Sequence, residues 1–113
     1  MKFSCDCGRI ISDQTDALPH KAHLIPDQLW NSLWDEIDAN ILLPLSQRRL
    51  TEEAASMRLR TLISNATRLA YQCPDCGRLF LDVKQPALHA FVPADVATPR
   101  DILSATLSDA KDS

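Results

Sequence analysis

Four cysteines are the residues of this 113-residue chain whose type and spacing could do chemistry. Cys5 and Cys7 are separated by one residue, and Cys73 and Cys76 are separated by two. A cysteine thiolate is both a nucleophile and a metal ligand, and closely spaced pairs are typical of metal sites. Two such pairs, each presented by its own turn, can surround a tetrahedral cation with each sulfur about 2.3 Å from the metal. The spacing therefore predicts one metal site with Cys5, Cys7, Cys73 and Cys76 as ligands.

The sequence around the second cysteine pair repeats the sequence around the first. Residues 3–13 align with residues 71–82 when one residue is deleted between the cysteines of the second pair. Each copy has an aromatic residue two positions before its first cysteine, an acid between the cysteines, then Gly-Arg and two apolar residues. Gly8 and Gly77 are the two glycines of the chain, and each follows a second cysteine, where a tight turn favours a positive φ angle. The repeat predicts two similar short hairpins that face one another across the metal.

These turns also resemble a known family. Cys73-Pro74-Asp75-Cys76-Gly77, and more loosely Cys5-Asp6-Cys7-Gly8, resemble the rubredoxin-like knuckles of the zinc-ribbon family. The first knuckle is one residue shorter than the usual Cys-x-x-Cys-Gly, which leaves His20 or His23 as a replacement for one of its cysteines. The resemblance implies a small antiparallel zinc-ribbon sheet that binds structural Zn²⁺. Iron is the alternative metal, since four thiolates suit both ions.

Two other interpretations of the cysteines are weaker. A thioredoxin-like dithiol at Cys73 and Cys76 would begin a helix, whereas strand-like sequence flanks this pair. A disulfide framework is disfavoured because no secretory signal is visible and a bridge between Cys5 and Cys7 would be strained. The chain also lacks any apolar run that approaches the length of a membrane span. We therefore expect a cytoplasmic protein with reduced thiols.

A helical insert of about residues 26–67 is predicted between the two knuckles. The first helix starts near Pro26-Asp27 and carries an apolar face with period four, and Pro44 is expected to close it. That face consists of Leu29, Leu33, Ile37 and Ile41, and we place Trp30 and Trp34 beside it in the core. Thr51 is the expected N-cap of a second helix, with Glu52 and Glu53 in its first turn. The two helices should form an antiparallel hairpin.

The rest of the chain predicts strands and a tail. Strands are expected at residues 68–72, 78–83 and 88–92, whereas the segment between Pro19 and Pro26 is predicted to be a loop with solvent-exposed histidines. The fold class is therefore α+β, with residues 1–93 forming a single zinc-ribbon domain around the helical insert. Residues 94–113 form a C-terminal tail or a short helix that starts near Thr98-Pro99.

Function follows from the metal site and from the charge. A site closed by four thiolates leaves no position for water or substrate, so we expect structural metal and no enzyme activity. The net charge is −3, and residues 1–43 carry three basic and seven acidic side chains. We therefore favour a noncatalytic module that binds a protein partner, and immunity proteins that neutralise basic toxins are one class of this kind. A nucleic-acid-binding zinc ribbon is disfavoured by the acidity, although residues 44–80 are locally basic, and a rubredoxin-like iron electron carrier is the third alternative.

Overall fold

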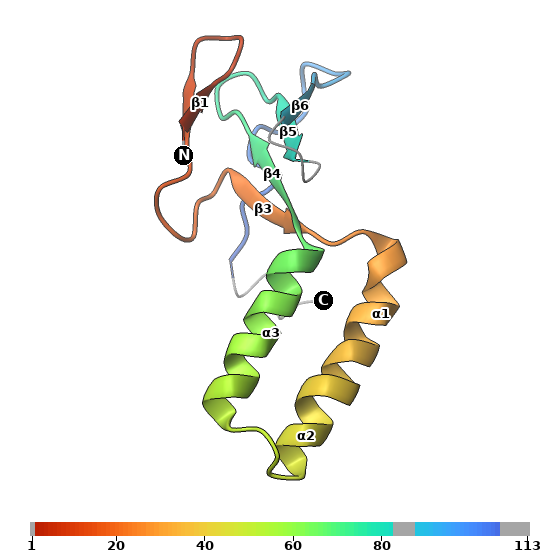
Figure 1. Cartoon of the computed structure of the whole chain (residues 1–113). Coiled ribbons are helices and arrows are strands. Elements are labelled where there is room, and N and C mark those ends of the chain that lie inside the picture. The colour runs from red at the N-terminus through yellow and green to blue at the C-terminus, as the bar shows by residue number, and fades with distance from the viewer. Residues whose placement is uncertain (1, 83–87, 107–113) are drawn as a thin grey trace. The chain divides into compact units, whose positions relative to one another are not determined.

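The computed structural model describes residues 2–82 and 88–106, and the fold is mixed α+β as predicted (Figure 1). The chain divides into two compact units, each of which is described by itself. One unit combines Met1–His23 with Arg68–Ser113, and the other is Leu24–Thr67. Within the described part of the chain, no helix combines the length and apolar character that crossing a membrane requires.

The first hairpin of the cysteine-bearing unit consists of β1 (Lys2–Ser4) and β2 (Ile10–Ser12), which pair antiparallel. A second sheet has the order β3-β4-β5-β6. Its strands are β3 (Lys21–Leu24), β4 (Arg68–Gln72), β5 (Leu79–Asp82) and β6 (Leu88–Phe91). The pairs β4–β5 and β5–β6 are antiparallel. The three strands expected after residue 67 are confirmed, although Val83 of the expected second one lies outside the described residues.

Strand β3 corrects the prediction of a loop between Pro19 and Pro26. This strand lies at an edge of the sheet beside β4. Lys21-Ala22-His23-Leu24 alternates polar and apolar residues over only four positions, between Pro19 and Pro26, so its strand signal is short and weak. The backbone N–H of Gln72 donates to the carbonyl of His20 at 2.8 Å, just before β3 begins. Pairing with β4 therefore determines this strand, and local propensity does not.

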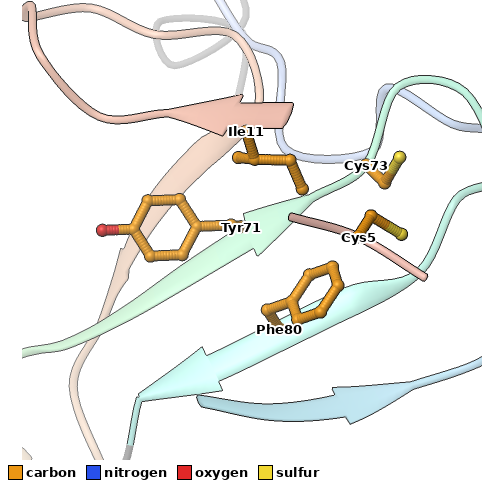
Figure 2. Close-up of a cluster of buried hydrophobic side chains, with 5 residues drawn as sticks. All are labelled: Cys5, Ile11, Tyr71, Cys73 and Phe80. Atoms are coloured by element: carbon orange, nitrogen blue, oxygen red, sulfur yellow. The ribbon is translucent and has the colours of Figure 1, made fainter. Parts of the chain in front are cut away.

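An aromatic core lies behind the cysteines. Its buried members are Cys5, Ile11, Tyr71, Cys73 and Phe80 (Figure 2). The half-buried Phe3 ring packs edge-on against Tyr71 and Phe80, with centroid distances of 5.3 and 5.0 Å. Both hairpins contribute to this cluster, so burial of one apolar core holds these two distant parts of the sequence together.

The unit Leu24–Thr67 is an antiparallel helical hairpin, as predicted (Figure 1). The first helical segment runs through α1 (Asp27–Ile37), the π-helical η1 (Asp38–Leu42) and α2 (Leu43–Ser46), and α3 (Glu52–Ala66) returns beside it. The buried residues of the hairpin are Leu33, Ile37, Ile41, Ala55 and Ala66. Thr51 caps α3 as expected, because its hydroxyl accepts a hydrogen bond from the Ala54 backbone N–H at 3.1 Å.

Pro44 does not close the first helix, contrary to the sequence prediction. Proline removes the N–H that would bond to the carbonyl four residues earlier, and its ring crowds that carbonyl. Here the helix widens to π-helical geometry over Asp38–Leu42, and the N–H of Leu43 bonds to the carbonyl of Asp38, five residues back. The carbonyl of Asn40, which Pro44 leaves without its helical donor, accepts a hydrogen bond from Arg58 Nη1 of α3 at 2.8 Å. The helix therefore continues to Ser46.

The prediction that Trp30 and Trp34 belong to the core is wrong. The two side chains are 44% and 49% exposed, whereas Leu33 and Ile37 are buried. At 100° per residue the tryptophans lie about 60° and 100° around the helix from Leu33, so they sit at the border of the face that α3 covers. Leu29, at the other border, is also 39% exposed. One partner helix is too narrow to cover the whole apolar face.

The C-terminal segment that the structure describes is not helical. Residues 98–106 contain turns and irregular backbone, so the short helix considered for this region does not form there, and residues 107–113 of the expected tail lie outside the described part. The buried side chain of Gln72 holds this segment, accepting from the Ile102 N–H at 3.0 Å and donating to the Pro99 carbonyl at 3.0 Å. Because the Pro99 carbonyl and the Ile102 N–H bond to Gln72, they are not available for the hydrogen bonds of a helix that starts at Thr98-Pro99. This explains why the expected helix does not form.

Candidate metal centre

The two cysteine turns have the same backbone design. In the first turn the Cys5 N–H donates to the Arg9 carbonyl at 2.8 Å, and the Gly8 N–H donates to the Cys5 carbonyl at 2.9 Å. In the second turn the Cys73 N–H donates to the Arg78 carbonyl, and the Gly77 N–H donates to the Cys73 carbonyl, both at 2.9 Å.

The strands that carry these turns also share one register. Phe3 pairs with Ile11 across the first hairpin, and Tyr71 pairs with Phe80 across the second. In each hairpin, the aromatic residue before the first cysteine therefore faces the second apolar residue after Gly-Arg. The internal repeat read from the sequence is confirmed as two similar hairpins.

Both turns require a positive φ angle at glycine, and both glycines have one. Gly8 has φ of 98° and Gly77 has φ of 82°. A side chain would be strained at either position, because L-residues rarely adopt this conformation. Gly77 is further restricted, since a Cβ atom there would lie 3.2 Å from Pro93 Cγ.

All four sulfurs meet at one place. The Sγ atoms of Cys5, Cys7, Cys73 and Cys76 lie within 4.8 Å of one another. Two distances are shorter, at 3.4 Å between Cys5 and Cys76 and 3.6 Å between Cys7 and Cys73. A tetrahedron of sulfurs about 2.3 Å from a zinc ion has edges of about 3.8 Å, so the spacing suits such an ion. The cysteines are positioned for a metal ion.

Burial differs among the four cysteines. Cys5 and Cys73 are buried, Cys76 is half-buried, and Cys7 is exposed. In Figure 2 the sulfurs of Cys5 and Cys73 both point away from the Tyr71 ring, out of the aromatic core. The site therefore lies between the core and the surface, and Cys7 forms its outer side.

The sulfurs perturb one another's protonation. Burial raises the pKa of Cys5, but hydrogen bonds from the Cys7 backbone and from the Cys76 and Arg78 side chains outweigh it and lower the pKa to about 7. The Arg9 backbone lowers the pKa of Cys7, but burial and the neighbouring sulfurs, Cys73 first, raise it to about 12. Cys5 therefore loses its proton easily. The negative charge of one thiolate then opposes deprotonation of a second cysteine such as Cys7. A divalent cation would relieve this repulsion.

Arg78 is a site residue to which the sequence alone assigned no role. Its Nη1 lies 3.8 Å from the Sγ atoms of both Cys5 and Cys76. Hydrogen bonding to Cys5 raises the pKa of the guanidinium further, so its positive charge is retained beside the sulfurs. The repeated Gly-Arg was the signal for it. Arg9, the equivalent residue, instead forms an exposed ion pair with Asp75 at 3.4 Å.

The two candidate histidine ligands are placed outside the sulfur cluster. His20 Nε2 is hydrogen-bonded to the Ser12 carbonyl at 2.8 Å, and His23 is an exposed residue of β3. Among the described residues, the one group of three or more candidate ligands contains cysteines alone. His20 is half-buried, so the expected solvent exposure holds for His23 and not for His20.

A polar cluster of Asp13, Lys21 and Tyr71, which lies beside the aromatic core, was also not predicted from the sequence. Lys21 Nζ forms an ion pair with Asp13 Oδ1 at 2.8 Å, and the Tyr71 hydroxyl donates to the other oxygen of Asp13. The bonds from Lys21 and then from Tyr71 lower the pKa of Asp13, while burial and Asp13 raise the pKa of Tyr71. The cluster joins the end of β2 to β3 and β4. No motif marks it, because Asp13 and Tyr71 are far apart in the sequence.

Comparison with known proteins gives a family. No curated protein and no solved structure matches the chain. One family model, described as Domain of unknown function (DUF8617), matches residues 1–95, a range that includes all four cysteines. Because this range is most of the chain, the protein belongs to the family described as Domain of unknown function (DUF8617).

Proposed function

We propose that this protein is a noncatalytic binding module whose two cysteine knuckles, of the zinc-ribbon kind, are held together by one structural Zn²⁺. The observation that carries the proposal is the convergence of four sulfurs within 4.8 Å from two distant parts of the sequence. Thiolate ligands in tetrahedral number suit zinc, and all four positions of the ion are then filled by protein. The metal stabilises the fold and performs no reaction.

Two hollows that described residues form beside the site are small, which supports a role without catalysis. The hollow lined by Arg9, Ile10, Ile11, Ser12, His20 and Pro74 has a volume of about 100 Å³. A second hollow, beside Cys76 and Arg100, measures about 140 Å³. Pockets for small-molecule substrates are usually about 300 to 1,000 Å³. Neither hollow is large enough for a typical substrate.

Measuring the zinc content of protein purified without chelator tests the metal part of the proposal. We expect one zinc per chain in the unaltered protein and a colourless solution. Cys76→Ser and Cys7→Ser should each lower the zinc content strongly, because each removes one thiolate ligand. Asp75→Asn is the matched control, since Asp75 lies in the same knuckle but contacts Arg9 instead of the sulfurs.

Each outcome of the zinc measurement is decisive. Zinc at one per chain that disappears in both serine variants and stays in Asp75→Asn supports the proposal. Unaltered protein without metal, or serine variants that keep full zinc, would overturn it. A red protein that contains iron would instead identify the rubredoxin-like alternative.

Two arguments support a binding role. Four thiolates would fill every position of the metal, which leaves none for a substrate, and the N-terminal part of the chain is acidic. Residues 1–43 carry seven acidic and three basic side chains. Such an excess of acidic side chains favours a basic protein partner, as in immunity proteins that bind basic toxin domains.

A further inference from the structure

The exposed tryptophans of α1 form an ordered pair. Trp30 and Trp34 pack edge-on, with ring centroids 5.6 Å apart and planes at 89°. Each ring therefore restricts the other although both are about half exposed. Ordered, exposed tryptophan is costly in water and is enriched at the centres of protein interfaces.

Carboxylates stand at both ends of this pair. Residues three or four apart on a helix are neighbours on its surface, so Asp27 lies one turn before Trp30 and Asp38 lies one turn after Trp34. The four side chains Asp27, Trp30, Trp34 and Asp38 form a continuous row, which we call the tryptophan row. All four are exposed.

The negative charge of this helical segment is not balanced by basic residues of the segment itself. Residues 26–47 contain Asp27, Asp35, Glu36 and Asp38 and no lysine or arginine. Within the described part of the chain, the ion pairs are Arg9–Asp75 and Lys21–Asp13, so none involves this helix. The tryptophan row is thus an aromatic surface between two carboxylates that have no cationic partner among the described residues.

We propose that the tryptophan row binds an arginine-bearing segment of a partner protein. A guanidinium stacks on an indole face and donates paired hydrogen bonds to a carboxylate, and this row offers both groups side by side. A lysine ammonium also pairs with a carboxylate, but it lacks the planar guanidinium that stacks on an indole and donates two parallel hydrogen bonds. Arginine is therefore the better match. This inference rests on the proposed binding role and names the chemistry of the partner.

Tryptophan fluorescence tests the inference without a label, because Trp30 and Trp34 are the only tryptophans of the chain. The zinc-loaded full chain is titrated with a short arginine-rich peptide, and with lysine-rich and glutamate-rich peptides of the same length. We expect a saturable change of emission with the arginine peptide, weaker binding of the lysine peptide and none of the glutamate peptide. Binding should weaken with added salt, since exposed charges are screened.

Variants locate the binding to the row. Asp27→Asn and Asp38→Asn should each weaken arginine-peptide binding by about two- to fivefold, as expected for loss of one exposed charged contact. Trp34→Ala should weaken it by a similar factor of about two to five through loss of a stacking surface, while Trp30 still reports. Glu36→Gln is the matched control, because it removes a charge from the same helix but lies about 160° around the helix from both Trp34 and Asp38, away from the tryptophan row. Circular dichroism confirms that each variant remains helical.

The outcomes separate this inference from the proposed function. Equal effects of Glu36→Gln and Asp38→Asn, or equal binding of the arginine and lysine peptides, would overturn the tryptophan row as an arginine site. Tryptophan emission typical of buried side chains in the absence of peptide would also overturn it. A dimer that forms with increasing concentration and buries Trp30 and Trp34 would do the same. Zinc content is measured in the same samples. Loss of peptide binding with full zinc rejects the inference alone, whereas peptide binding by a chain that never holds zinc rejects the proposed function alone.

Discussion

Gly8 and Gly77 occupy equivalent turns beside the sulfurs but differ in their surroundings. Both have positive φ angles, so alanine at either site adopts a conformation that costs about 1–2 kcal/mol for an L-residue. At Gly8 nothing lies within 4 Å of the added Cβ, whereas at Gly77 the Cβ also meets Pro93 Cγ at 3.2 Å and Arg100 Cγ at 3.5 Å.

Gly77→Ala should therefore destabilise the zinc-loaded protein more than Gly8→Ala does. We expect a difference of about 1 kcal/mol in the free energy of unfolding, the usual lower cost of overpacking. Urea unfolding of the two variants at saturating zinc measures it. Equal losses of stability would show that Pro93 moves aside freely.

Gln72 is the buried polar residue that secures the C-terminal segment. It is 1% exposed, and its amide accepts from the Ile102 N–H and donates to the Pro99 carbonyl. The amide also donates to the Gly77 carbonyl at 3.4 Å, so Gln72→Leu preserves the size of the side chain but leaves three backbone groups without this partner.

We expect Gln72→Leu to cost about 1–3 kcal/mol, the usual penalty for a group left unsatisfied, or less if residues 99–102 move out into water. In either case, hydrogen exchange should accelerate at Ile102 while the zinc content stays unchanged. Unchanged exchange at Ile102 would contradict the role assigned to Gln72.

At the scale of the elements, the least expected feature is the helix that passes through Pro44. The π-helical turn and the Arg58 side chain together accommodate the missing N–H, since Arg58 donates to the Asn40 carbonyl. Arg60 lies on the same helix, and its Nε reaches Ser56 Oγ only at 3.4 Å.

Arg58→Ala should lower the free energy of unfolding of the helical hairpin by about 1 kcal/mol, whereas Arg60→Ala should change it by a few tenths. Thermal unfolding followed by the helical circular dichroism signal measures both. A larger effect of Arg60→Ala than of Arg58→Ala would contradict the explanation given for Pro44.

The sequence predicted those elements whose signals are local. Thr51 begins α3 because capping is a property of a few neighbouring residues, and the strands around Cys73 follow from alternation and the Gly77 turn. Strand β3, which has only four alternating residues, and the path of residues 98–106 depend on distant partners, β4 and Gln72, and no local pattern specifies these partners. The tryptophans were misplaced because helical periodicity gives the direction of an apolar face but not the width that a partner covers.

The candidate site shows the same limit. The cysteine spacing and the repeated Gly-Arg predicted which four residues the structure brings together. The different roles of Arg78 and Arg9 could not be predicted, because they depend on how the two hairpins face one another. Arg78 lies beside two sulfurs and Arg9 beside Asp75.

At the scale of the whole molecule, the two units have separate cores. The cluster around Tyr71 contains two of the four cysteines whose sulfurs meet, and the cluster around Leu33 contains none. Structural zinc in a knuckle domain contributes about 10–16 kcal/mol of binding free energy, which is comparable to or larger than the stability of an ordinary small domain. The metal should therefore matter most to the cysteine-bearing unit.

Chelation of the zinc is expected to unfold the cysteine-bearing unit and to leave the helical hairpin weakened but formed. Hydrogen exchange should rise sharply in residues 2–23 and 68–82, and less in residues 27–66. Far-ultraviolet circular dichroism should keep most of its helical signal. An unchanged melting curve after complete removal of zinc would refute a structural role for the metal.

The proposed metal centre requires four sulfurs from two distant parts of the chain to bind one zinc ion. X-ray absorption spectroscopy at the zinc edge of the purified protein observes these ligands themselves. We predict a single shell of four sulfur neighbours at about 2.3 Å. A shell that contains nitrogen or oxygen ligands, or fewer than four sulfurs, would contradict the proposed centre.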